Sequence, residues 1–105
     1  GLENLSDIMA VDGIDGFFIG PYDLSGSFGK PGDFDDPEVN KALETAQHYC
    51  KSGNKPGGYH VVHTTDDALE KKIKDGYHFI AYGTDTIFLT EKLQTESNRR
   101  KILLR

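Results

Sequence analysis

Apolar and polar residues alternate along the chain with two different periods. Three short apolar runs, rich in β-branched and aromatic residues, have the length and composition of buried strands. They span residues 14–19, 55–62 and 77–82. Elsewhere apolar residues recur every three or four positions, as in amphipathic helices. These stretches span residues 1–10, 36–53, 64–76 and a last segment that starts near 86. Strands joined by connections this long are parallel with right-handed crossovers, so the pattern predicts one α/β domain.

The boundaries of the longest predicted helix are the clearest. Asp36 can accept hydrogen bonds from the free N–H groups of the first turn, and Pro37 suits the first helical position. Gly53 suits the exit. In the last predicted strand, residues 77–82 are almost continuously apolar rather than alternating. Such a strand is expected to be covered on both faces.

A glycine-rich segment, residues 21–34, follows the first predicted strand. We predict a long loop there, with one helical turn around residues 24–28. Loops of this length are uncommon in compact domains and are usually functional. In parallel α/β proteins, ligands bind at the carboxyl ends of the strands. Asp23, a polar residue at that end of the first strand, is therefore the first candidate for chemistry.

Composition excludes several classes of partner. The formal net charge of −5 argues against nucleic-acid binding, which needs clustered Lys and Arg. The two basic clusters, at 71–74 and 99–101, are interpreted as solvated helix faces. Cys50 is the only cysteine, so no internal disulfide can form, which suits a reducing compartment. No apolar run approaches the ~20 residues of a membrane span, and the first 30 residues are too acidic for a signal peptide. We expect a cytoplasmic protein with no membrane or nucleic-acid partner.

One motif carries a resemblance to a known family. The stretch FFIGPYDLSGSFGKPG (17–32), preceded by VDGID and followed by DPEV, resembles the signature of the HpcH/HpaI aldolase family. The pieces ENLSDIM, GGYHVV and DGYHFIAYGTDTIFL are similar to family segments and run in the same order. These enzymes are metal-dependent class II pyruvate aldolases on a (β/α)8 barrel. Family members usually have a small residue at the position of Tyr22, a departure that we expect to alter how the pocket is lined.

The resemblance predicts the fold class. A complete barrel needs roughly 250 residues, and 105 residues supply about three βα units. We therefore expect residues 1–105 to be a single partial domain, the C-terminal portion of a (β/α)8 TIM barrel. Because the chain begins with Gly1 rather than Met, we expect a processed or excised piece.

The resemblance also implies a metal site at Asp23. In the family, this aspartate is a ligand of a divalent cation, together with a glutamate from the preceding strand, and the cation holds the keto and carboxylate oxygens of pyruvate. Mg²⁺, Mn²⁺ or Co²⁺ suits carboxylate and water ligands. From the residues alone an alternative stays open: Asp23 caps the turn that follows it.

Neighbouring residues are predicted to bind substrate. The backbone N–H groups of Tyr22 and Asp23 would receive the substrate carboxylate, as the resemblance implies and as turn amides can do. Gly20 would let the ligand approach, and Pro21 belongs to the same segment. Ser25 either donates a hydrogen bond to the ligand or is an ordinary cap.

His60 and Asp85 are further candidates. Strand periodicity places His60 on the opposite face from Tyr59 and His63. The resemblance puts His60 beside the aldehyde portion of the substrate, where it could contact a polar or acidic tail. A metal pair of His60 and His63 has poor spacing for a strand. Asp85 matches a family motif at the end of the third strand, although capping of the next helix explains it equally well.

The expected activity is that of a lyase. The resemblance implies reversible, metal-dependent cleavage of a 4-hydroxy-2-oxo acid, of the 2-keto-3-deoxy sugar acid or hydroxy-oxo-diacid type, to pyruvate and an aldehyde. It also implies a small-molecule 2-oxo acid substrate and a homo-oligomer, a trimer or hexamer, when the protein is full length. The family's metal-binding glutamate, catalytic histidine with its acidic partner, and keto-polarising arginine have no matching positions here. No catalytic residue is therefore assigned within the chain.

Two alternatives remain beside this expectation. A citramalyl- or malyl-CoA-type lyase of the same superfamily would share the barrel and the metal chemistry but accept a thioester. A catalytically incomplete fragment would act only as an assembly piece, because three parallel strands leave two open edges and an uncovered face.

Overall fold

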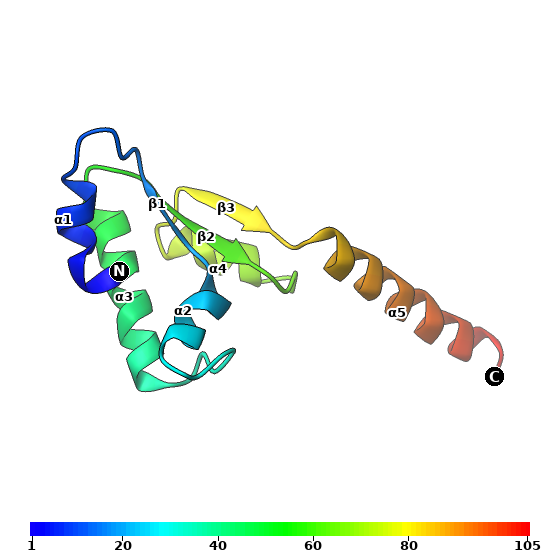
Figure 1. The fold of residues 1–105 in the computed structure, drawn as a ribbon. Helices are drawn as coiled ribbons and strands as arrows, with labels where there is room; N and C mark the ends of the chain where they lie inside the picture. Colours follow the sequence, from blue (N-terminus) through cyan, green and yellow to red (C-terminus); the bar gives the residue numbers. More distant parts are fainter.

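The computed structural model describes all 105 residues and contains one parallel three-stranded sheet in the order β1-β2-β3 (Figure 1). The strands are β1 (Phe17–Ile19), β2 (Gly57–Val61) and β3 (Phe79–Tyr82). The helices are a 3-10 turn η1 (Leu2–Asn4), α1 (Leu5–Met9), α2 (Pro21–Ser27), α3 (Pro37–Ser52), α4 (Ala68–Lys74) and α5 (Asp85–Leu103). At least one helix follows each strand, which confirms the predicted α/β class and the parallel topology.

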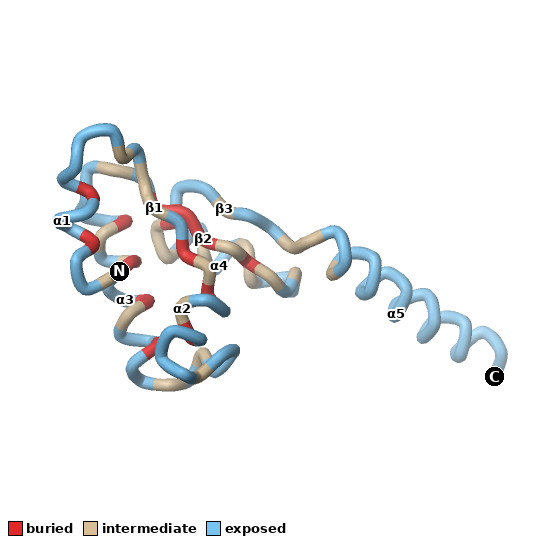
Figure 2. Tube along the Cα trace, in the orientation of Figure 1, coloured by how far each residue is buried: buried red, intermediate tan, exposed pale blue.

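One face of the sheet packs against α3 and forms the core. Ile19 of β1 and Tyr59 and Val61 of β2 point to this face and are buried. They meet the buried side of α3, which consists of Val39, Leu43, Ala46 and Cys50. Figure 2 shows buried segments along β1, β2 and α3, whereas β3 and α5 have none. The packing of β1 and β2 on α3 therefore supplies most of the apolar burial.

The ends of α3 form as the sequence predicts. The Asp36 carboxylate accepts hydrogen bonds from the backbone N–H groups of Glu38 (2.9 Å) and Val39 (3.3 Å). Pro37 occupies the first helical position, and Gly53 is the residue at which the helix ends. The predicted cap, first residue and exit are all confirmed.

The opposite face of the sheet is open. Phe18, Gly58 and Phe79 form one row across the three strands. The rings of Phe18 and Phe79 stack over Gly58 with their centroids 5.8 Å apart, and a Cβ at Gly58 would collide with both rings. Phe18 is still 48% exposed and Phe79 45%. Within this chain the expectation that the third strand is covered on both faces is wrong, because no element packs over this row.

The first strand is shorter than predicted. Residues 14–16 lie outside the ladder, and the pairing begins where the Phe17 N–H donates to the carbonyl of Pro56 (3.1 Å). Pro56 has no N–H to continue the ladder in the other direction.

A helix replaces most of the predicted loop. Instead of a single turn around residues 24–28, α2 begins directly after β1 at Pro21. Proline is favourable at the first helical position because its φ is already helical and its missing N–H would have had no partner there. The non-helical connection to α3 is therefore only residues 28–36.

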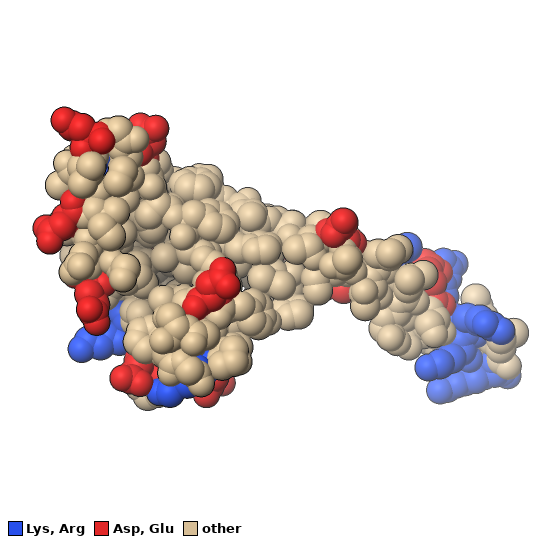
Figure 3. Space-filling model, in the orientation of Figure 1, with Lys and Arg blue, Asp and Glu red and all other residues tan.

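The last helix projects away from the body as an arm (Figures 1 and 2). It is helical through the polar stretch 94–101, and none of its residues is buried. The basic residues Arg99, Arg100, Lys101 and Arg105 lie at its far end, where Lys and Arg gather in Figure 3. No helix in the structure has the length and apolar character needed to cross a membrane.

Candidate functional site

Asp23 lies in the first turn of α2, at the carboxyl end of β1. Its carboxylate is exposed and takes part in no ion pair or hydrogen bond of the chain. No side chain caps α2 at all, so the alternative in which Asp23 caps the turn is not what the structure shows. Both carboxylate oxygens are free to accept a ligand.

Gly20 determines which way the Asp23 carboxylate points. Gly20 has extended backbone angles (φ −92°, ψ 105°), so by strand periodicity its side-chain direction is that of Phe18, on the open face. The Oδ2 atom of Asp23 lies 2.9 Å from the place where a Cβ of Gly20 would be. The carboxylate therefore stands at the open face. Because any residue can adopt these angles, the glycine is needed for space rather than for a turn.

The first backbone N–H groups of α2 have no partner within the helix. Pro21 has no N–H, and those of Tyr22 and Asp23 belong to the first turn, which no side chain caps. The prediction that these amides receive a substrate carboxylate is compatible with this geometry and stays a prediction.

His60 lies on the same open face as Gly20 and Asp23. It follows Gly58 by two residues in β2 and pairs with Ala81 of β3. Its Nε2 is 3.0 Å from the carbonyl oxygen of Gly83. A carbonyl only accepts, so Nε2 carries the proton, and Nδ1 of the neutral ring is left as an acceptor. A polar group of a ligand that contacts Nδ1 would therefore have to be a donor.

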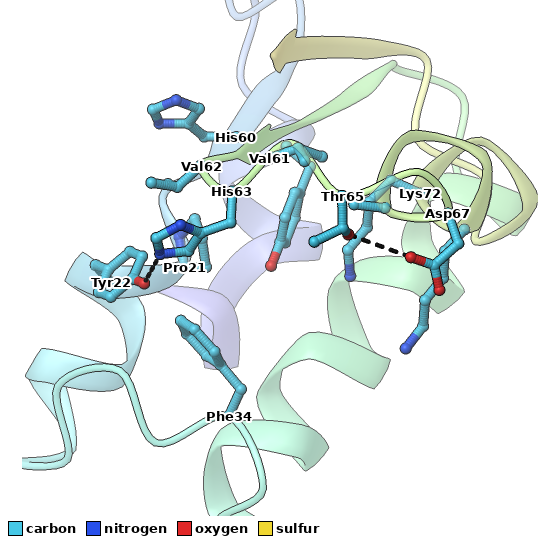
Figure 4. A pocket seen from close by; sticks show the side chains of 13 residues that line it. Pro21, Tyr22, Phe34, His60, Val61, Val62, His63, Thr65, Asp67 and Lys72 are labelled. Carbon is cyan, nitrogen blue, oxygen red and sulfur yellow. Dashed lines mark hydrogen bonds between the residues drawn. The ribbon is translucent and has the colours of Figure 1, made fainter. Parts of the chain in front are cut away.

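Tyr22 points away from Asp23. Its hydroxyl is 3.0 Å from Nε2 of His63, and its ring meets the ring of Phe34 edge-on at 5.1 Å (Figure 4). The expectation that this tyrosine alters how the substrate pocket is lined stays a prediction. Tyr22 lines a hollow of about 320 Å³ beside β2 together with Pro21 and His60, whereas Asp23 does not line it.

Ser25 is fully buried and its hydroxyl is already used. The hydroxyl donates to the carbonyl of Tyr22 (3.1 Å) and accepts from the N–H of Gly32 (2.9 Å). Of the two roles left open for Ser25, the structure supports the structural one: it ties α2 to the loop that follows.

Asp85 also has a local explanation. Thr84 caps α5 by accepting from the N–H of Ile87 (3.3 Å), and the Asp85 carboxylate accepts from the N–H of Thr86 (2.7 Å). The carboxylate thus serves the start of α5.

The hollow lined by Tyr22 also contains a lysine, Lys72, that the sequence did not reveal. Lys72 is half-buried with its Nζ 4.1 Å from the centre of the Tyr59 ring and 3.4 Å from the Asp75 carboxylate. Burial lowers the pKa of Lys72, and burial raises the pKa of Tyr59 to about 12. The only hint in the sequence is the apolar surrounding of Tyr59 on its strand; nothing local predicts that a lysine lies over it.

The two histidines do not form a metal pair. Nε2 of His60 lies 3.0 Å from the carbonyl oxygen of Gly83, whereas Nε2 of His63 lies 3.0 Å from the hydroxyl of Tyr22, so each ring has its own partner. The chain holds no group of three or more His, Cys, Asp or Glu side chains placed to bind a metal ion. Asp23 fits a hard cation as a single free carboxylate ligand, and further ligands would have to come from other residues or from the substrate.

Comparison with known proteins places this arrangement in a family. The sequence pattern of the HpcH/HpaI aldolase/citrate lyase family matches residues 1–91. The chain belongs to this family. Its similarity to curated proteins is also substantial: it is 43% identical over 93 residues to the 2-keto-3-deoxy-L-rhamnonate aldolase of Klebsiella pneumoniae and 41% over 95 residues to that of Salmonella typhi.

Only part of each relative is matched. The alignments cover 88% and 90% of this HpcH/HpaI family chain but 34% of each relative, so the chain spans about a third of their length.

The fold is shared with solved structures. An HpcH/HpaI aldolase from Desulfitobacterium hafniense matches with a TM-score of 0.80 at 21% identity, over 95% of this chain and 38% of that one. The citrate synthase SbnG matches with a TM-score of 0.77 at 23% identity, over 96% and 40%. The chain has the fold of part of a (β/α)8 barrel.

Proposed function

We propose that this chain contributes part of the active site of a lyase that reversibly cleaves a 4-hydroxy-2-oxo acid to pyruvate and an aldehyde. A 2-keto-3-deoxy sugar acid is the proposed substrate class, since the relatives that are 41–43% identical are named 2-keto-3-deoxy-L-rhamnonate aldolases. Family membership and these names support the proposal, and one structural observation carries it.

That observation is the free Asp23 carboxylate at the open face. Asp23, Gly20 and His60 lie at the carboxyl ends of β1 and β2, the end at which parallel α/β folds bind ligands. A capping or ion-paired aspartate would have its oxygens occupied. Here they are unpartnered, and Gly20 keeps the space beside them clear.

The proposed cofactor is Mg²⁺, Mn²⁺ or Co²⁺. Asp23 would hold it as one ligand, and the carboxylate and keto oxygens of the 2-oxo acid would be further ligands. When bound, such a cation supplies Lewis-acid stabilisation of the charge that develops on the keto oxygen. His60 would face the remaining part of the substrate, with Nδ1 ready to accept a hydrogen bond from a hydroxyl.

The test is titration of the chain with Mn²⁺ and pyruvate, followed calorimetrically. We expect pyruvate-dependent Mn²⁺ binding that Asp23→Asn abolishes. Asp33→Asn, in the exposed loop after α2, is the matched control and should leave binding unchanged. Equal binding by the Asp23→Asn variant, or no binding by a chain that remains folded, would contradict the proposal.

A second candidate function has its own observation. The exposed Phe18–Phe79 stack and the lack of a three-ligand group fit a chain that serves only as a structural part of a larger barrel. This alternative gives no Asp23-dependent binding. The thioester-cleaving lyase and the homo-oligomer stay predictions, since no feature of the described residues favours or opposes either.

A further inference from the structure

We propose that Tyr22 and His63 are positioning residues: their hydrogen bond fixes the first turn of α2 and so holds the Asp23 carboxylate at the open face of the sheet. The inference rests on the proposed function, in which Asp23 is a cation ligand. It assigns a role to two side chains that do not contact the Asp23 carboxylate.

The order of residues in α2 couples the side chains of Tyr22 and Asp23. Tyr22 and Asp23 are adjacent at the start of the helix, and their side chains leave it in different directions, about 100° apart in an ideal helix. Tyr22 points to His63, whereas Asp23 points to the space beside Gly20. Any rotation of the first turn that moves one side chain moves the other. Fixing the Tyr22 hydroxyl therefore fixes the direction in which the Cα–Cβ bond of Asp23 leaves the helix.

His63 is a suitable anchor because it lies after the carboxyl end of β2, whereas Tyr22 follows β1. It lies two residues beyond β2, and the 3.0 Å contact of its Nε2 with the Tyr22 hydroxyl joins segments 41 positions apart in the chain. The bond thus ties the segment after β1 to the segment after β2. Figure 4 shows the Tyr22 hydroxyl and the His63 ring facing each other, with a dashed line between them.

The remaining side of the Tyr22 ring is braced by the loop after α2. Phe34 contacts the ring edge-on, and a Cβ at Gly32 would lie 3.3 Å from a ring carbon. Ser25 holds the same loop to α2 through the Gly32 N–H. Lys30 holds it to the start of α3 by an ion pair with Asp36 at 2.6 Å. The loop therefore supports the ring, and the hydroxyl is the only polar group that the side chain contributes.

The exposure of Tyr22 allows a positioning role to be tested separately from global stability. Tyr22 is 40% exposed and its hydrogen bond with His63 lies at the surface, so its loss should lower global stability by no more than one such bond contributes. Tyr22→Phe keeps the ring contact with Phe34 and removes only the hydroxyl. His63→Gln keeps a side-chain amide near the position of Nε2, whereas His63→Ala removes it.

The experiment uses NMR on the 105-residue chain, with hydrogen exchange of the α2 amides and the Mn²⁺ affinity in the presence of pyruvate as readouts. Tyr22→Phe and His63→Ala should both speed exchange in α2 and weaken Mn²⁺ binding, each roughly three- to tenfold, the factor that one such hydrogen bond is worth. His63→Gln should restore most of both. The urea midpoint should fall only slightly in Tyr22→Phe and His63→Ala, and all three variants should remain folded under the conditions of the binding measurement. Tyr82→Phe, at another tyrosine that is 40% exposed, is the control and should change neither readout.

The outcomes distinguish this inference from the proposed function. If Asp23→Asn abolishes Mn²⁺ binding but Tyr22→Phe leaves both exchange and affinity unchanged, the positioning role is overturned and the metal site stands. If Asp23→Asn does not change the Mn²⁺ affinity, the proposed function fails. The positioning role of the Tyr22–His63 hydrogen bond then fails with it, even if exchange in α2 still depends on these two residues. A loss of affinity that His63→Gln does not restore would also overturn the inference, because it would not depend on the hydrogen bond.

Discussion

The two faces of the sheet differ in what covers them. On the face toward α3, Ile19 is only 6% exposed, and Tyr59 and Val61 are buried with it. On the other face the neighbouring residue Phe18 is 48% exposed. The free Asp23 carboxylate and His60 lie on this face at the carboxyl ends of the strands. One face thus holds the chain together, and the other presents the groups that fit a ligand.

This division separates stability from chemistry within a single short strand. Because alternate residues of a strand point to opposite faces, a substitution at Ile19 tests the core and one at Phe18 or Gly20 tests the open face. Changes on the two faces should therefore have different consequences, which the following experiments measure in order of expected size.

The largest difference should be between two adjacent residues of β1. Ile19→Ala leaves a cavity in the core and should lower the free energy of unfolding by about 3 kcal/mol. Phe18→Ala removes a larger side chain but one that is half exposed, and should cost about half as much or less. Urea denaturation of both variants is the measurement. Equal losses would show that the open face is covered in solution.

A smaller effect is expected from the glycine that allows the Phe18–Phe79 stack. Gly58→Ala introduces a Cβ that collides with both rings and should cost about 2 kcal/mol. Adding Phe79→Ala should recover part of this loss by relieving the collision. Gly26→Ala is the matched control: nothing lies within 4 Å of its Cβ position in α2, so it should stabilise slightly. A Gly58→Ala variant with unchanged stability would mean that the Phe18–Phe79 stack is absent.

The weakest effect concerns the tyrosines of the packed face. Burial raises the pKa of Tyr59 to about 12 and raises that of Tyr77 as well. A raised pKa means that the unfolded chain loses these protons first, so their contribution to stability is complete below about pH 10 and is lost as the pH rises toward 12. Stability measured across this range should fall, and Tyr59→Phe should make the fall shallower. A slope that is unaffected by Tyr59→Phe would contradict the assignment.

Much of the fold follows from the sequence because its signals are local. The apolar stripe of α3, its Asp36 cap and the period of each strand depend on residues near one another in the chain. The helix at Pro21–Ser27 is predicted as part of a loop because Gly26, Gly29 and Gly32 follow the strand closely, whereas Pro21 at the first position favours a helix.

The parts that could not be predicted depend on contacts between distant segments. Tyr22 and His63 are 41 positions apart, and Lys72 reaches Tyr59 from another element. Strand periodicity placed His60 and His63 on different faces, but it gave no partner for either. The role of Gly20 was also unpredictable, because it depends on where the helix after it turns the Asp23 side chain.

The most direct test of the account is a crystal structure of the chain with Mn²⁺ and pyruvate, located by the anomalous signal of manganese. We expect a peak in ligand contact with the Asp23 carboxylate, on the side of the sheet that carries His60, and no such peak in Asp23→Asn crystals. A chain that is folded as described but shows no manganese at Asp23, or shows it equally in the variant, would contradict the central claim that this carboxylate is a cation ligand.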